Sequence, residues 1–147
     1  MKYVFDTNIL VHYIRESPLS VTVEETFQPF IEGNRTWLSA VSIGEIRSFA
    51  MQAKWGPNRI NRLEELIQRF LILDVNIEEL HHRYAEIDAF SQAKHPTIPS
   101  NFSARNMVGK NDLWIAATAS LLDGTLLTTD SDFNHLNNEF LQVERLG

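Results

Sequence analysis

The chain has 147 residues, 44% of them hydrophobic and 22% charged, which predicts one compact domain over residues 1–147 with a core of its own. It contains no cysteine, so disulfides, thiolate metal sites and cysteine nucleophiles are excluded, and any metal must bind oxygen or imidazole. Nineteen acidic and thirteen basic side chains give a net charge of −6, which argues against binding nucleic acid by bulk electrostatics.

The N-terminal apolar run ends at Asp6 and is too short for a signal peptide or a membrane span. Together with the absence of cysteine, this predicts a cytoplasmic protein without a membrane segment.

Strand-like and helix-like segments alternate through the first half of the chain. Residues 2–5 are apolar β-formers, and Asp6 opens a helical pattern that reaches Ile14. Gly33-Asn34 and Gly56-Pro57 are expected to break the chain between later elements. We predict a helix, a strand, two helices and a strand at residues 20–31, 36–39, 40–55, 58–70 and 71–73.

The second half continues this alternation. Asn76 is interpreted as the cap of a helix that reaches about Lys94, and a loop rich in proline and serine follows. Asp112 begins an almost wholly apolar helix that ends before Gly124. A strand, a short helix and a closing strand are expected at residues 125–129, near 133 and at 140–143. The alternation predicts a three-layer α/β/α sandwich around a mostly parallel sheet.

Four acidic residues are expected at one edge of this sheet. Asp6 and Asp130 directly follow strands, where parallel sheets bind their ligands. Glu45 lies near the start of the helix after the second strand, and Asp112 lies in the first turn of the apolar helix. Four acids from distant positions are therefore predicted to converge.

Each acid also has a structural explanation when it is taken singly. Aspartates at helix starts are good caps and suit the positive end of the helix dipole, which would explain Asp6, Asp112 and Asp130. Glu45 would then be an exposed helix residue, and we interpret Asp74, at another strand end, as structural.

Taken together, the acids indicate a metal site. Clustered carboxylates repel one another, and such a cluster persists mainly where a cation neutralises it or protons are shared. Ligands that are all oxygen atoms favour Mg²⁺ or Mn²⁺. Such a metal activates water and stabilises the charge that develops during attack on a phosphodiester, which predicts hydrolysis.

Four short segments carry a resemblance to a known family. They are Asp6-Thr7-Asn8, Ser-Ala-Val-Ser-Ile-Gly-Glu at 39–45, Gly-Lys-Asn-Asp-Leu-Trp-Ile-Ala-Ala at 109–117, and Thr-Thr-Asp-Ser-Asp-Phe at 128–133. In this order they resemble the PIN domain family, and within it the VapC-type toxins. The resemblance implies a PIN-like fold and a metal-dependent endoribonuclease that cleaves single-stranded RNA as the toxin of a toxin–antitoxin pair.

The resemblance also implies roles for particular residues. The catalytic acids would be Asp6, Glu45, Asp112 and Asp130. The same four residues would bind the metal, with Asp132 assisting or replacing Asp130. Thr7 would hydrogen-bond to an acid.

A homodimer and an antitoxin protein are further implications of the resemblance. The two helices joined at Gly56-Pro57 would leave a groove for an amphipathic partner helix. Their apolar residues equally suit the domain's own core: Ile43, Ile46, Phe49, Trp55, Ile60, Leu63, Leu66 and Ile67.

A local basic rim would offset the acidic net charge where RNA binds. The candidates are Arg47, Lys54, Arg59, Arg62, Arg69, Arg105 and Lys110, although solvated surface explains most of them individually. His81 and His82 are interpreted as surface residues rather than a ligand pair, and the tryptophans as core or interface anchors.

Other functions fit the sequence less well. A haloacid dehalogenase-type phosphatase needs a second acid two residues after the first, where this chain has Asn8. A response-regulator receiver needs a lysine late in the chain, and none follows Asp130 at the required place. The stronger alternative is a PIN-like binding module or scaffold without cleavage activity, against which the retention of four acids argues.

Overall fold

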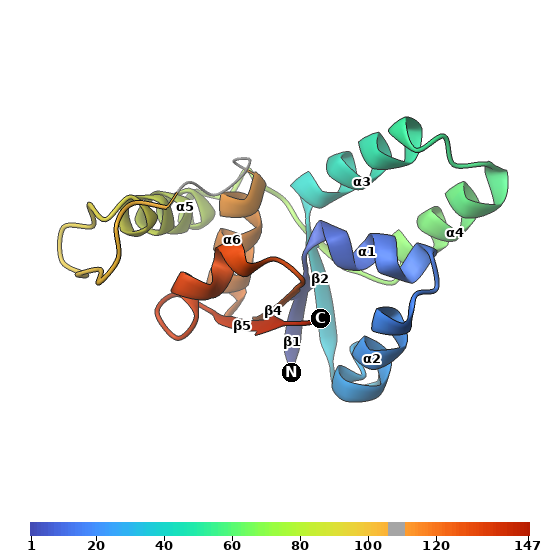
Figure 1. Cartoon of the computed structure of the whole chain (residues 1–147), viewed down its shortest axis with the longest axis horizontal. Coiled ribbons are helices and arrows are strands. Elements are labelled where there is room, and N and C mark those ends of the chain that lie inside the picture. The colour runs from blue at the N-terminus through green and yellow to red at the C-terminus, as the bar shows by residue number, and fades with distance from the viewer. Residues whose placement is uncertain (106–110) are drawn as a thin grey trace.

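The computed structural model describes residues 1–105 and 111–147. Within these residues, five strands form a parallel sheet in the order β3-β2-β1-β4-β5 (Figure 1). The strands are β1 (Lys2–Phe5), β2 (Arg35–Ser39), β3 (Leu71–Leu73), β4 (Thr125–Thr128) and β5 (Gln142–Arg145). The strands β2 and β3 lie on one side of β1, whereas β4 and β5 lie on its other side. The strand order therefore reverses between β1 and β4.

Helices cover both faces of the sheet, which confirms the predicted three-layer α/β/α sandwich. One face carries α1 (Thr7–Ile14), α2 (Pro18–Phe27), α3 (Ala40–Gln52) and α4 (Pro57–Ile67). The other carries α5 (Glu78–Ser91), α6 (Asn111–Leu122) and the 3₁₀ helix η1 (Ser131–Leu136). Figure 1 shows the sheet between these two groups. None of the described helices combines the length and apolar character needed to cross a membrane.

Alternation along the central strands creates two separate cores. Successive side chains of a strand point to opposite faces, so Val4 and Leu126 enter one core and Phe5 and Leu127 enter the other. The ring of Phe5 lies 5.5, 5.9 and 5.0 Å, between centroids, from those of Tyr13, Phe30 and Phe70. The apolar sheet is thus buried on both sides, as parallel sheets require.

Several element boundaries differ from the sequence prediction. The second helix begins earlier, with Pro18 in its first turn, and it ends at Phe27 because Gln28 adopts a left-handed conformation. Asn76 was wrongly predicted as a helix cap: Ile77 occupies that position, and the Asn76 backbone N–H donates to the Asp74 carboxylate over 3.0 Å. Asp74 is therefore structural, as interpreted. The closing strand lies two residues later than expected.

The apolar residues of α3 and α4 belong mainly to the core. Ile46, Trp55, Leu63, Leu66 and Ile67 are buried in the first core. The other three, at positions 43, 49 and 60, are partly buried and pack against the same core. The core explanation of these side chains is therefore confirmed, and the partner groove between the two helices stays a prediction.

The inner strand β2 should contribute more to stability than its neighbour β3 at the edge of the sheet. Leu38 in β2 is fully buried, whereas Leu71 in edge strand β3 is 45% exposed. Leu38→Ala should lower the free energy of unfolding by about 2–5 kcal/mol, and Leu71→Ala by less than about 1 kcal/mol. Urea unfolding of both variants tests this difference. Equal losses of unfolding free energy would contradict the different burial of the two strands.

Candidate active site

The four predicted acids lie around one cavity at the carboxyl edge of the sheet. The cavity has a volume of about 250 Å³ and is lined by Asp6, Thr7, Asn8, Val11, Glu45, Phe49, Asp112 and Asp130. It forms there because β1, β2 and β4 are parallel and end at the same edge, next to the reversal of strand order. The convergence expected from the sequence therefore occurs, and the catalytic role of these acids stays a prediction.

Asp6 is the innermost acid, with only 4% of its surface exposed. One carboxylate oxygen accepts a hydrogen bond of 2.7 Å from the backbone N–H of Thr7. The other accepts one of 2.7 Å from the hydroxyl of Thr128, the fully buried last residue of β4. The Thr128 hydroxyl also accepts a 2.9 Å hydrogen bond from the backbone N–H of Asp130. Thr128 thus fixes two of the acidic segments at once.

Glu45 is oriented by a side chain from another element. The hydroxyl of Thr7 donates a 2.8 Å hydrogen bond to Oε1 of Glu45, which joins the start of α1 to α3. This confirms the expectation that Thr7 hydrogen-bonds to an acid. Glu45 is half-buried, and it lines the cavity.

Three other carboxylates approach one another closely enough to share a cation. Asp112, Asp130 and Asp132 each offer an oxygen atom, and these three atoms lie within 4.8 Å of one another. Oδ1 of Asp130 accepts a 2.9 Å hydrogen bond from the Asp132 backbone N–H, so Asp130 also caps η1. Capping and clustering therefore coexist. Asp130 and Asp132 both reach the cluster rather than one replacing the other.

Burial, together with the nearby negative charges, raises the pKa of two of these acids. Burial raises the pKa of Asp6 to about 6, with smaller contributions from the charges of Glu45 and Asp130, although hydrogen bonds from Thr128 and Thr7 oppose the shift. The pKa of Asp112 rises to about 7, first through burial and then through the negative charges of Asp6 and Asp130. Both carboxyl groups therefore hold a proton more readily than an ordinary aspartate does, because the cavity disfavours their negative charge.

This donor set fits a small divalent cation. All the candidate ligands are carboxylate oxygens, the kind that Mg²⁺ and Mn²⁺ bind. A cation would also relieve the repulsion that raises the pKa of Asp112. The trio of Asp112, Asp130 and Asp132 has the tightest geometry, whereas Asp6 and Glu45 reach the site from the side of β1 and α3.

Most members of the predicted basic rim are engaged elsewhere. Arg47 pairs with Glu64 at 3.1 Å, and Arg62 pairs with Glu16 at 2.7 Å. The guanidinium of Arg69 lies 3.9 Å from the centre of the Phe30 ring. Lys54 and Arg59 line a hollow beside Trp55, and Lys110 lies outside the described residues. Arg105 is the candidate that shares a pocket with an acid of the cluster, Asp132.

The histidines have distinct environments. His81 and His82 are exposed, as interpreted, and Nε2 of His81 lies 2.8 Å from the backbone oxygen of Val75. His95 accepts two backbone N–H hydrogen bonds within its own loop. Burial lowers the pKa of His135, and the nearby positive charge of Arg105 lowers it further. Trp55 is buried, and the other two tryptophans pack against the second core, as expected.

Sequence reasoning missed two features of this edge. Thr128 was quoted within a motif but received no role, because a threonine at the end of a strand is otherwise an ordinary β-former. The pocket beside Asp132 was missed because its walls come from segments separated in the chain, around Arg105 and His135. A basic residue in the loop before the apolar helix was the available signal.

Comparison with known proteins assigns the family. The family model described as "PIN domain" matches residues 3–139. The chain belongs to the PIN domain family. The carboxylate cavity lies within the matched residues, so the acids belong to the shared part of this PIN domain.

Relatives of known function carry VapC names. The chain is 24% identical over 136 residues to "Ribonuclease VapC2" of Haemophilus influenzae, covering 89% of this chain and 87% of the relative. It is also 24% identical over 128 residues to "Ribonuclease VapC1" of the same species, covering 87% and 86%.

Solved structures share the fold of this PIN domain. VapBC2 from Rickettsia felis, bound to a DNA fragment from its promoter, matches with a TM-score of 0.76 and 22% identity. VapBC-1 from nontypeable Haemophilus influenzae matches with a TM-score of 0.72 and 24% identity. Each match covers 99% of this chain and 98% of the other chain.

Loss of the Thr128 hydroxyl should destabilise the fold, because two hydrogen bonds of the site are lost. Thr128→Val keeps the shape but leaves the Asp6 oxygen and the Asp130 N–H without their partner. We expect the free energy of unfolding to fall by about 1–3 kcal/mol. Thr128→Ser keeps the hydroxyl and serves as the control in chemical denaturation. If the serine variant were the less stable of the two, the hydrogen bonds would not be the cause.

The raised pKa of Asp112 predicts a pH dependence of stability in chelator. Its pKa is about 7 in the fold against an ordinary value of 3.8, so between these values the folded state binds more protons than the unfolded state. Stability should therefore fall as pH rises from about 4 to 7. Asp112→Asn should reduce that fall, by about 1 kcal/mol for a half-exposed group. Melting curves in EDTA at several pH values test this, and identical profiles would refute it.

Proposed function

We propose that this PIN protein is a Mg²⁺- or Mn²⁺-dependent endoribonuclease that cleaves single-stranded RNA in the cytoplasm, as the toxin of a toxin–antitoxin pair. The observation that carries the proposal is the group of five acids at one edge of the sheet: Asp6, Glu45, Asp112, Asp130 and Asp132. The family assignment and the ribonuclease names of the relatives support the same activity.

The proposed metal ligands are the closely spaced carboxylates of Asp112, Asp130 and Asp132, together with Asp6 and Glu45. A bound Mg²⁺ or Mn²⁺ would supply an activated water and would stabilise the charge that develops on the phosphate. In hydrolysis of a phosphodiester, the oxygen of water forms a bond to phosphorus, the bond from phosphorus to one ester oxygen breaks, and that ester oxygen leaves with a proton from the water.

The protein's own side chains would hold this geometry in advance. Hydrogen bonds from Thr7 and Thr128 fix both oxygens of Asp6, so its carboxylate needs no rearrangement. The Thr7 hydroxyl holds the Glu45 carboxylate, which also lines the cavity. Because these acids project from strand ends and helix starts, their separation is set by the rigid sheet.

The proposed partner is an antitoxin protein, and the proposed assembly also contains a second copy of the chain. The matched structures of Rickettsia felis and Haemophilus influenzae are described as VapBC, and a Klebsiella pneumoniae match is described as a toxin–antitoxin complex. An antitoxin that covered the acid cavity would block RNA entry. The buried side chains of α3 and α4 are not the proposed contact.

Removal of one acid should abolish cleavage without unfolding the protein. With fluorescently labelled single-stranded RNA, the unmodified protein should cleave in Mg²⁺ or Mn²⁺ and stop in EDTA. Asp112→Asn should reduce the rate by at least about 100-fold, because it removes a charged ligand but keeps the helix start.

Asp74→Asn is the matched control, since Asp74 also follows a strand but is exposed and lies outside the acid cavity. It should leave the cleavage rate within about twofold, as for an ordinary surface change. A folded protein that cleaved no single-stranded RNA with either metal would favour the alternative of a binding module. Normal cleavage by Asp112→Asn would return that residue to a structural role.

A further inference from the structure

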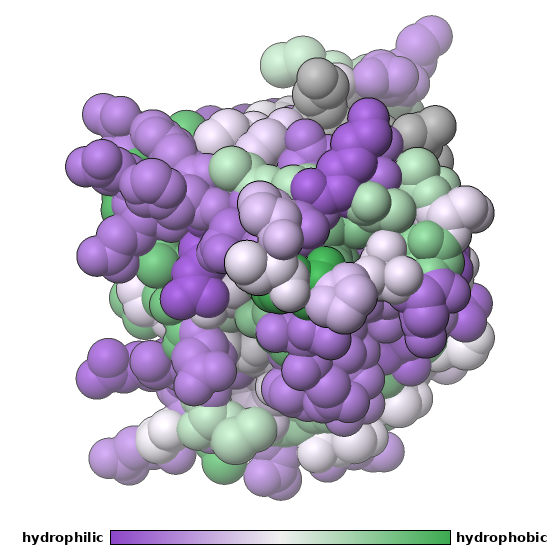
Figure 2. Space-filling view, turned by 90° about the vertical axis from the view of Figure 1, so that its left-hand side faces the viewer, coloured by the Kyte–Doolittle hydropathy of each residue, from purple (hydrophilic) through white to green (hydrophobic). Residues whose placement is uncertain are grey.

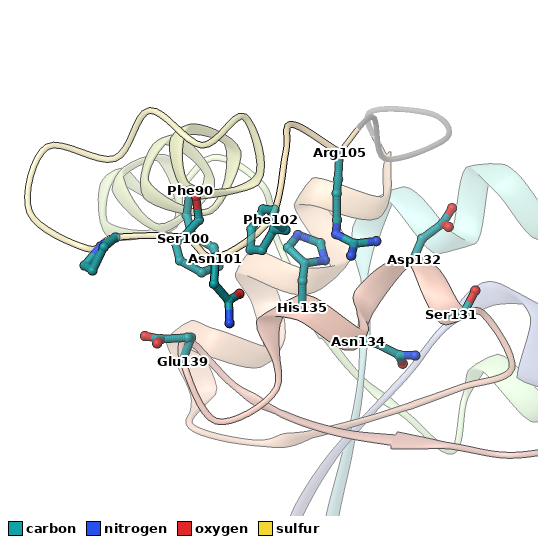
Figure 3. A pocket seen from close by; sticks show the side chains of 11 residues that line it. Phe90, Ser100, Asn101, Phe102, Arg105, Ser131, Asp132, Asn134, His135 and Glu139 are labelled. Carbon is teal, nitrogen blue, oxygen red and sulfur yellow. The ribbon is translucent and has the colours of Figure 1, made fainter.

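A larger pocket adjoins the acid cavity on the side of α5 and η1. It has a volume of about 710 Å³, within the range of small-molecule sites. Figure 3 shows Phe102 and Arg105, on the loop that follows α5, next to His135 on η1, with Asn101 on one side of His135 and Asn134 on the other. Arg105 extends from the loop toward η1. Figure 2 looks onto this side of the molecule, where hydrophilic residues cover most of the surface.

The loop wall of this pocket is held in place by hydrogen bonds and ring contacts. The backbone N–H of Arg105 donates to the backbone oxygen of Ser91 over 2.7 Å. The Ser91 hydroxyl lies 2.8 Å from Nε2 of His135, which links the end of α5 to η1. The Phe102 ring lies 5.3 Å, between centroids, from those of both Phe90 and His135. The pocket is therefore formed before any ligand arrives.

Asp132 connects this pocket to the acid cluster. Its carboxylate belongs to the trio with Asp112 and Asp130, and the same residue lines the pocket. If a phosphate of an RNA chain reached the three aspartates, the next nucleotide of that RNA would therefore lie at the entrance of the pocket. This continuity distinguishes the pocket from the hollows beside Trp55 and at the start of β1.

The side chains in the pocket suit a nucleotide. The Arg105 guanidinium lies 5.2 Å from the centre of the Phe102 ring and is exposed, so its donors can reach a phosphate. The side-chain amides of Asn101 and Asn134 are both exposed and can pair with base edges as donor and acceptor. An arginine here also supplies positive charge in a chain of net charge −6.

We infer that this pocket is a subsite for the RNA nucleotide next to the cleaved bond, with Arg105 binding its phosphate and Asn101 and Asn134 selecting its base. The inference rests on the proposed ribonuclease function and adds to it a determinant of sequence preference. The acids perform the reaction, whereas the pocket holds the strand in register with them.

The phosphate contact is tested by direct binding, without cleavage. Labelled single-stranded RNA is titrated by fluorescence anisotropy into Asp112→Asn protein, with and without Arg105→Ala. We expect Arg105→Ala to weaken binding about tenfold. The slope of log affinity against log salt should fall by about 0.7, the value for one phosphate contact on a single strand. Arg105→Lys should keep the salt slope.

Arg35→Ala is the matched control for these titrations. Arg35 is an exposed arginine at the start of β2, and parallel strands begin at the edge opposite the acids. It should leave affinity and salt slope unchanged.

Base selection is tested with an RNA pool of random sequence. Sequencing of the products gives the nucleotide preference beside the cleaved bond. Asn134→Ala and Asn101→Ala should flatten that preference at one position and lower the rate on the preferred sequence by about fivefold or more, the loss of one base contact. Asn58→Ala, an exposed asparagine of α4 in the other helical layer, should leave the preference intact.

The outcomes separate the two proposals. If the unmodified protein cleaves RNA but Arg105→Ala binds with unchanged affinity and salt slope, the subsite is wrong and the nuclease stands. Unchanged preference in both asparagine variants would likewise overturn the base-selecting role. If the unmodified protein cleaves nothing yet Arg105→Ala weakens binding and flattens the salt slope, the pocket binds RNA and the nuclease proposal fails.

Discussion

The site depends on the hydrogen bond from Thr128 to Asp6. Asp6 is nearly buried, and a buried carboxylate without partners is costly because it loses its hydration. The Thr128 hydroxyl replaces part of that hydration and at the same time accepts the N–H of Asp130. The bond joins residues 122 positions apart and links the ends of β1 and β4. Acids from both ends of the chain are thereby held at one edge.

Burial and the repulsion between the carboxylates change the pKa values of these acids. Hydrogen bonds from Thr7 and Thr128 oppose the upward shift of the Asp6 pKa, but Asp112 is shifted further, to about 7. The fold therefore accepts electrostatic repulsion at this edge, and two well-formed apolar cores on either side of the sheet offset it.

The distribution of cations complements that of the acids. Arg47 and Arg62 are paired with glutamates, and Arg69 lies against an aromatic ring. The net negative charge therefore does not oppose RNA binding uniformly, because what matters is the charge near the strand. Arg105 provides positive charge beside the acid cluster, in the pocket that Asp132 shares.

The sequence by itself determined the α/β sandwich, because apolar periodicity and the positions of glycine and proline reflect local physics. It also placed Asp6 and Asp130 at one edge, since each follows a strand and parallel strands end together. Glu45 and Asp112 were expected at the same edge because each lies near the start of a helix, and the resemblance then implied their catalytic role.

Only the tertiary structure decided the role of Thr128, the sharing of Asp132 between cluster and pocket, and the burial of the α3 and α4 apolar residues. Each depends on contacts between segments far apart in the chain. Local sequence patterns do not show which distant side chains come into contact.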